Sequence, residues 1–457
     1  MSTEPPDAKS VSGDVGAPEG SEASAHRSAE AGPKEGRAHG PMARMERARE
    51  TTLELIASLT DEQLRAWPDP AFSPICWHIG HVAFTEAQWV LGRCIGDEAL
   101  SKPHFERFAQ NGCAKSERAK GFDRPALLAY LHEVRAATRE RWPAEHALAR
   151  DGYLDWFLAC HEHQHRETIA LVLAMTQRDT GDAFAAASAR AEPLVSGAAA
   201  ERWTFGGEGR VGTHDLLAYD NERPSASVSL EPYALDARVV SAFEWRAFLS
   251  DAPFETPSLW DDAATTFLAA GARLPRPWRE AGGGYVELAP SGARALRGPE
   301  PVWGVSLFEA RAYARWAGAD LPTEDEWEFA AQIESERAAQ IESEREAHVE
   351  AASHRESAFA GDAPAHADLA SPGGAPKASE SLFGGVWQWT KSPFAPREGF
   401  VAHPYEGYSA PYFDGIHHVL RGGSFATDRA IARATFRNWF VPETRQIFCG
   451  LRLRHSL

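Results

Sequence analysis

The octapeptide Cys160-His161-Glu162-His163-Gln164-His165-Arg166-Glu167 decides how the first half of the chain is organised. His161 and His165 are four residues apart, so on a helix both imidazoles project from one face, one turn apart. The stretch 153–177 contains neither proline nor glycine, and apolar residues flank the octapeptide on both sides, which predicts a helix. Such a helix can bring two ring nitrogens to one metal ion, although a polar helix face without a metal shows the same spacing.

Residues 42–180 carry helical periodicity in four segments, which are 47–59, 74–91, 124–142 and 153–177. Four helices joined by mixed loops predict an up-and-down bundle whose core can hold a metal between facing helices. The second segment contains Trp77-His78-Ile79-Gly80-His81-Val82, with two histidines three positions apart. Either His78 or His81 could complete a three-histidine site. Three neutral imidazoles with open positions suit Zn or Fe(II).

The pattern changes on both sides of this bundle. Residues 1–41 have almost no large apolar side chains and are expected to be disordered, while the Ala-rich stretch 181–200 is expected to be a linker. Residues 201–457 combine glycines, tryptophans and short β-prone runs with helices at 306–317 and from 322 onward, which predicts an irregular α+β domain. Within it, 330–337 is repeated at once as 338–345, and 331–380 is expected to be a disordered or charged insertion, namely a charged helical extension that runs into disorder.

Composition limits the classes of function. The formal net charge is −18, from 65 acidic and 47 basic residues, which argues against a nucleic-acid partner and favours small-molecule substrates. No run of about 18 apolar residues is present, and the first residues lack a signal-peptide pattern, so no membrane partner is expected. The five cysteines show no CxxC spacing, which favours reduced thiols in the cytoplasm.

Two sets of motifs resemble one family. Residues 73–81, Ser-Pro-Ile-Cys-Trp-His-Ile-Gly-His, followed by the histidine octapeptide, resemble the DinB-like domain of the ergothioneine-biosynthesis sulfoxide synthases. Five motifs in the second half resemble the formylglycine-generating-enzyme or sulfatase-modifying-factor fold, which is a C-type-lectin-like fold. The motifs are Asp-Asn-Glu-Arg-Pro at 220–224, Leu-Pro-Thr-Glu-Asp-Glu-Trp-Glu at 321–328, Gly-Val-Trp-Gln-Trp-Thr at 385–390, Leu-Arg-Gly-Gly-Ser at 420–424 and Phe-Arg-Asn-Trp at 436–439. The resemblance covers about 42–457 apart from the insertion.

This resemblance implies a mononuclear non-haem Fe(2+) held by His81, His161 and His165, with His78 as a neighbour. It implies an O2-dependent reaction that joins a cysteine-type thiol to the imidazole of N-trimethylhistidine (hercynine), with sulfoxidation. A quaternary ammonium is well held by aromatic faces and neutral polar groups. The positions that match the family's substrate contacts are Gln164, Asn438 and Trp439, whereas His163 is expected to point elsewhere on its helix.

The chain departs from the family pattern at the thiol-binding positions. Phe440 stands where members that use γ-glutamylcysteine have an Asp, and Thr444 stands where they have an Arg, with Arg445 one step later. A γ-glutamyl donor needs charged partners, so their loss favours a smaller thiol, free cysteine first. The family's tyrosine proton donor has three candidates, Tyr405, Tyr408 and Tyr412. Arg118 and Lys115 are candidate partners of a substrate carboxylate, or else solvated surface charges.

Several alternatives stay open. A formylglycine-generating enzyme would need a local cysteine pair, and Cys449 is the only cysteine after Cys160. A DinB-like thiol transferase that uses Zn would not need the second domain. A lectin-like binding module would not need three candidate metal ligands. Within the family, histidine with cysteine, as in the ovothiol pathway, or a selenium donor could replace the expected substrates.

Overall fold

The computed structural model describes residues 42–194, 201–353 and 382–457. The tail expected to be disordered, 1–41, and the later part of the expected insertion, 354–380, lie outside the described residues. No helix within the described ranges is both long and apolar enough to cross a membrane.

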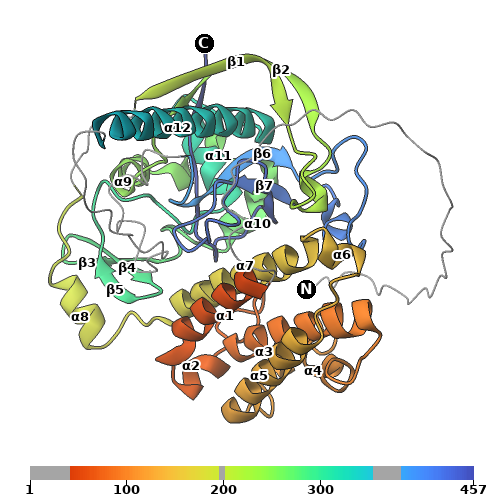
Figure 1. Ribbon diagram of the computed structural model, residues 1–457. Coiled ribbons are helices and arrows are strands. Elements are labelled where there is room, and N and C mark those ends of the chain that lie inside the picture. The colour runs from red at the N-terminus through yellow and green to blue at the C-terminus, as the bar shows by residue number, and fades with distance from the viewer. Residues whose placement is uncertain (1–41, 195–200, 354–381) are drawn as a thin grey trace. The chain divides into compact units, whose positions relative to one another are not determined.

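Four long helices form the predicted bundle, and they lie alongside one another (Figure 1). They are α1 (Met42–Ala57), α3 (Ile75–Glu86), α5 (Arg124–Glu140) and α7 (Tyr153–Thr176). A π-helix, Ala87–Ile95, prolongs α3 beyond its predicted end. Short helices occupy the connections: α2 (Asp61–Arg65), α4 (Phe105–Phe108) and α6 (Ala147–Arg150). The periodicity therefore predicted the helices correctly, and their apolar faces meet in one core.

A buried network of charges joins all four helices. Arg49 of α1 bonds Glu162 of α7 at 2.8 Å and Glu86 of α3 at 3.1 Å. Arg135 of α5 bonds Glu86 at 2.8 Å. Burial alone would raise the pKa of Glu86, but Arg135 and Arg49 outweigh it and hold that pKa below its ordinary value. Because each helix supplies one member, the network fixes the relative positions of all four.

Within residues 201–353 and 382–457, the second domain contains three small sheets and four α-helices. Their strands are β1 (Arg202–Val211), β2 (Ala226–Asp236) and β10 (Arg454–Ser456) in the first sheet, β3 (Trp278–Ala281), β4 (Gly284–Ala289) and β5 (Gly292–Ala295) in the second, and β8 (Asn438–Phe440), β7 (His418–Arg421), β6 (Trp387–Pro393) and β9 (Cys449–Gly450) in the third. The helices are α9 (Ala242–Ser250), α10 (Thr265–Ala269), α11 (Leu307–Trp316) and α12 (Glu324–Ser353). All these hydrogen-bonded strand pairs are antiparallel except β6 with β9, which is parallel. The predicted α+β class is confirmed.

The structure adds detail to two segments, the expected linker and the expected insertion. The expected linker, 181–200, contains a helix, α8 (Asp182–Ser188), which packs against β4 and β5 through Phe184 and Ala187. Helix α12 runs through the duplicated octapeptide to Ser353 and lies along β1. Ala331, which falls in the expected insertion, is buried in a core cluster with Trp327 and Phe329.

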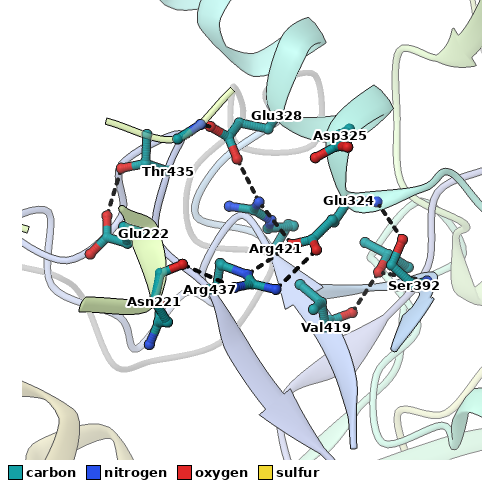
Figure 2. A network of polar contacts seen from close by, with 12 residues as sticks. Asn221, Glu222, Glu324, Asp325, Glu328, Ser392, Val419, Arg421, Thr435 and Arg437 are labelled. Atoms are coloured by element: carbon teal, nitrogen blue, oxygen red, sulfur yellow. Dashed lines mark hydrogen bonds and ion pairs between the residues drawn. The ribbon is translucent and has the colours of Figure 1, made fainter. Parts of the chain in front are cut away.

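The first turns of α12 anchor the third sheet. Glu328 accepts a bond from Arg421 of β7 at 2.6 Å, and Glu324 accepts one from Arg437 at 2.8 Å, as Figure 2 shows. Arg437 also donates to the backbone oxygen of Asn221 at 2.9 Å. All these charges are buried or nearly so. Since Arg437 immediately precedes β8, this network determines where the Asn-Trp pair of that strand lies.

Glu86 offers a test of the bundle network. We expect Glu86→Gln to lower the free energy of unfolding by about 3–5 kcal/mol, because two buried guanidinium groups lose a counter-charge. Urea unfolding of the full chain measures the loss. Glu46→Gln is the matched control, because Glu46 pairs with Arg139 on the half-exposed surface and should cost less than about 1 kcal/mol.

The difference in stability between the wild type and Glu86→Gln should depend on pH. In the folded protein the pKa of Glu86 lies below its ordinary value of 4.5. The ionised Glu86 and its two arginine partners therefore stabilise the fold at pH values above 4.5. The wild-type advantage over Glu86→Gln should then disappear as the pH falls through the lowered pKa. An advantage that is constant from neutral to strongly acidic pH would contradict the network.

Candidate metal centre

Three histidines from two helices converge inside the bundle. His81 comes from α3, and His161 and His165 come from α7; one ligand nitrogen from each lies within 4.8 Å of the others. The Nε2 atoms of His161 and His165 are 3.1 Å apart. Of the two histidines in the Trp-His-Ile-Gly-His motif, His81 is the one whose ring nitrogen belongs to this group of three.

The protonation of these rings suits a divalent metal. Burial is the main cause that lowers the pKa of His81 to about 4. Burial and the neighbouring histidines hold the pKa values of His161 and His165 well below the ordinary value. His81 donates from Nδ1 to the backbone oxygen of Phe108 at 2.6 Å, which leaves the lone pair on Nε2. Neutral rings with free lone pairs are the form in which histidine binds a metal.

The remaining histidines of the two motifs lie outside the cluster. His78 is buried beside it, with Nδ1 2.8 Å from Nδ1 of His165. His163 turns to another face of α7, where its Nδ1 lies 3.4 Å from the carboxylate of Asp428.

Gln164 reaches from α7 into the second domain. Its amide nitrogen donates to the hydroxyl of Tyr219 at 2.6 Å, and its amide oxygen accepts from the hydroxyl of Tyr408 at 3.3 Å. The two tyrosine rings stack with centroids 4.6 Å apart. Sequence reasoning missed Tyr219, although it directly precedes the Asp-Asn-Glu-Arg-Pro motif, and that adjacency was the available signal.

Trp439 of β8 lies next to this pair of tyrosines. Its ring stacks on Phe394 with centroids 4.3 Å apart and meets Tyr408 edge-on at 5.7 Å. Tyr412 approaches the same indole at 5.4 Å. The neighbouring Asn438 accepts a bond from the backbone nitrogen of Trp439. Contacts through Tyr408 therefore connect the indole to Gln164 and so to the helix that carries two of the histidines.

The three candidate tyrosines occupy different places. Tyr408 bonds Gln164, and burial raises its pKa well above the ordinary value. Tyr412 lies against Trp439. Tyr405 packs on Trp89 of the bundle and is 38% exposed. Among these three tyrosines, Tyr408 is the one that bonds Gln164, which lies between His161 and His165 in the sequence.

The candidate carboxylate partners are occupied within the protein. The Nη atoms of Arg118 donate to Ser73 and Gln110, both at 2.5 Å, while its guanidinium lies 3.9 Å over Trp77. Lys115 donates to the backbone oxygen of Ala71 at 2.7 Å.

The third region singled out by sequence lies after β8. Phe440 packs against the main core as a partly buried side chain. Thr444 closes a turn by donating its backbone nitrogen to Val441. Arg445 pairs with the buried Glu309 at 2.9 Å, so the one arginine near this position already has a counter-charge.

A buried carboxylate fixes α7 against the second domain. Glu167 accepts bonds from Trp387 at 2.7 Å, from Ser424 at 2.6 Å and from Thr427 at 2.7 Å. The adjacent Arg166 bonds Asp428 at 3.0 Å. The helix that carries the histidine pair is therefore also a helix of the interface between the domains.

Comparison with known proteins agrees with this architecture. The DinB superfamily model matches residues 44–169, and the sulfatase-modifying factor enzyme 1-like domain model matches 191–457. The hercynine oxygenase of Mycobacterium tuberculosis is 33% identical over 424 residues, which cover 89% of this chain and 96% of that protein. The chain belongs to the hercynine oxygenase family. A second member, from Mycolicibacterium thermoresistibile, is 34% identical over 427 residues, covering 89% and 92% of the two chains.

The second domain also has more distant relatives. The formylglycine-generating enzyme of Thermomonospora curvata is 36% identical over 141 residues, which cover 28% of this chain and 46% of that protein. Membership of the hercynine oxygenase family confirms the resemblance that the two sets of motifs indicated.

Gly80 offers a test of how the cluster is held. A Cβ at this position would overlap the buried ring of Phe108. The backbone oxygen of the same Phe108 accepts the hydrogen bond from His81. We expect Gly80→Ala to displace Phe108, lower the free energy of unfolding by about 1–3 kcal/mol and weaken Co²⁺ binding. Gly92→Ala is the matched control, because its Cβ would meet only ordinary contacts, the nearest at 3.7 Å. Equal effects of both substitutions would contradict a special role for Gly80.

Proposed function

We propose that this chain is an iron(II)-dependent sulfoxide synthase of ergothioneine biosynthesis, which uses O2 to join a cysteine-type thiol to the imidazole of hercynine. The observation that carries the proposal is the convergence of His81, His161 and His165 in a chain of the hercynine oxygenase family. The tyrosine and tryptophan cluster around Gln164 provides the adjoining substrate site.

The donor set supports iron. Three neutral imidazoles leave coordination positions open, and Fe(II) with few protein ligands is typical of oxygenases. Zn²⁺ also accepts three histidines, but it has no redox chemistry to offer O2. When bound, iron supplies a site at which O2 and a thiolate can react.

The aromatic cluster supports hercynine as the imidazole substrate. A trimethylammonium group is attracted to aromatic faces and needs no anionic partner. Tyr408, Tyr412 and Trp439 offer such rings, and Gln164 and Asn438 add neutral polar groups. Tyr219 holds the Gln164 amide by a 2.6 Å bond and so sets its orientation.

Tyr408 is the proton donor that we propose. Its hydroxyl bonds Gln164, which lies one residue from His165. Burial raises its pKa, so the hydroxyl is fully protonated at neutral pH and would give up the proton only to an acceptor that becomes strongly basic during the reaction. Tyr405 packs on Trp89 and is the weakest of the three candidates.

Free cysteine is the thiol that we propose. Phe440 offers no charge to a γ-glutamyl amino group, and the guanidinium of Arg445 is neutralised by Glu309. A donor with an additional charged end would leave that end without a partner at these positions, which would cost binding free energy. Arg118 and Lys115 stay candidate partners of the cysteine carboxylate, provided that they exchange their present backbone and hydroxyl contacts.

Other functions have weaker support. Cys449 is buried, its thiol donates to the backbone oxygen of Val305, and burial raises its pKa to about 12, which does not suit formylglycine-type oxidation. A DinB-like thiol transferase would not explain why Gln164 and Glu167 bond residues of the second domain. We also propose a cytoplasmic location, since all five cysteines are free thiols.

Anaerobic reconstitution tests the proposed reaction. The full chain is loaded with Fe(II), mixed with hercynine and cysteine, exposed to O2, and the products are analysed by mass spectrometry. We expect a hercynyl-cysteine sulfoxide. Parallel reactions replace hercynine with histidine, and cysteine with γ-glutamylcysteine or selenocysteine. A product only with histidine or only with a selenium donor would favour the ovothiol-type or selenium alternative, and a preference for γ-glutamylcysteine would contradict our interpretation of Phe440 and Arg445.

The ligand assignment has its own test. His161→Ala and His165→Ala should each abolish tight iron binding, because two remaining imidazoles make a poor site. Iron content after desalting measures the loss. The matched control is His163→Ala, on the same helix but turned toward Asp428, which should keep full iron occupancy. Full occupancy in the two ligand variants would show that the metal is bound elsewhere.

A further inference from the structure

His165 is held between two other imidazoles. Its Nε2 lies 3.1 Å from Nε2 of His161, and its Nδ1 lies 2.8 Å from Nδ1 of His78. His78 belongs to α3, one turn before His81, so the helix that supplies one candidate ligand also supplies a contact to another.

The hydrogen bond between the two Nδ1 atoms has a defined direction when a metal occupies the cluster. A metal at Nε2 of His165 needs the lone pair there, so the single proton of the neutral ring is on Nδ1. His165 then donates and His78 accepts. His78 must in turn carry its own proton on Nε2, which fixes the tautomers of both rings.

The contact with His165 is the side-chain hydrogen bond that the structure gives His78. Its Nε2 is buried and has no hydrogen-bond partner among the described residues. A buried polar atom without a partner is unfavourable, and an apolar side chain would avoid the cost. An apolar side chain at this position would lose the 2.8 Å contact with His165.

We propose that His78 is a positioning residue, a neutral imidazole that accepts the Nδ1 proton of His165 and holds this ligand in the orientation that the metal requires. This inference rests on the proposed metal site. Ligand histidines usually donate their second nitrogen to a carboxylate, a backbone oxygen or water, and loss of such a partner typically weakens metal binding. Here the partner of His165 is a second histidine, while that of His81 is the backbone oxygen of Phe108.

A neutral partner has a chemical consequence. A carboxylate at this position would place negative charge behind the ligand and make its imidazole more electron-donating. A neutral imidazole leaves more of the metal's positive charge to attract an anionic ligand at an open position, and a thiolate is such a ligand. The inferred role of His78 thus extends from holding the ring to favouring an anionic substrate.

Three substitutions of nearly equal size separate these effects. In His78→Asn the side-chain oxygen replaces Nδ1 as a neutral acceptor, in His78→Asp the acceptor is charged, and in His78→Leu it is absent. Co²⁺ binding to the full chain is measured by competition with a chelator and by the visible spectrum of the bound ion, and azide then serves as the anionic probe. His132→Leu is the control, because His132 is exposed on α5.

We expect His78→Leu to weaken Co²⁺ binding roughly 10–100-fold and to change the spectrum, with His78→Asn restoring both. His78→Asp should keep the Co²⁺ affinity but bind azide several-fold more weakly than His78→Asn. His132→Leu should match the wild type. Equal Co²⁺ affinity and spectrum in the wild type and a folded His78→Leu would overturn the proposal.

Folding is checked by circular dichroism for each variant. If His78→Leu does not fold, the azide comparison decides, and equal azide affinities in His78→Asp and His78→Asn overturn the inference. A wild-type chain that binds no Co²⁺ or Fe²⁺ at all would instead overturn the proposed function, and the role of His78 with it.

Discussion

The buried carboxylate of Glu167 is the constraint on which the site depends. Burial raises its pKa above the ordinary value, although bonds from Ser424, Thr427 and Trp387 oppose that rise. Those three donors belong to the second domain, so the carboxylate orders residues far apart in sequence around one point of α7. Removing it would leave three buried donors unsatisfied. The position of α7 relative to the second domain is therefore fixed within one turn of the histidine pair.

That placement gives one helix three tasks. His161 and His165 face α3 and its His81, Gln164 faces Tyr219 and Tyr408, and Glu167 faces the second domain. Helical spacing separates these directions by fractions of a turn. Any shift of α7 that moved the histidines would move Gln164 as well, so the proposed metal ligands and the proposed substrate contact Gln164 keep a constant relation. In the second domain, the bond between Arg437 and Glu324 fixes the start of β8 and therefore the position of Trp439.

Sequence reasoning was strongest where the pattern is local. The four bundle helices followed from periodicity, and the i, i+4 pair at 161 and 165 followed from helical geometry. It was weakest where partners come from distant segments. Spacing could not choose between His78 and His81, because that choice depends on how α3 turns toward α7. Tyr405, Tyr408 and Tyr412 could not be separated either, since only the folded loop puts Tyr408 on Gln164 and Tyr405 on Trp89. Helix α8 was missed because its burial is provided by β4 and β5.

The charges near the cluster support a chemistry of anionic ligands. Glu162 is the immediate neighbour of His161 in sequence, and an unpaired carboxylate there would compete for the metal's charge. It is instead bonded to Arg49, within a network that also neutralises Arg135 and Glu86. The histidines are left with uncharged partners, His78 and the backbone of Phe108. A dication held by three neutral ligands would keep its net charge in a medium of low dielectric. The strongest electrostatic partner for it would then be the thiolate of the proposed substrate.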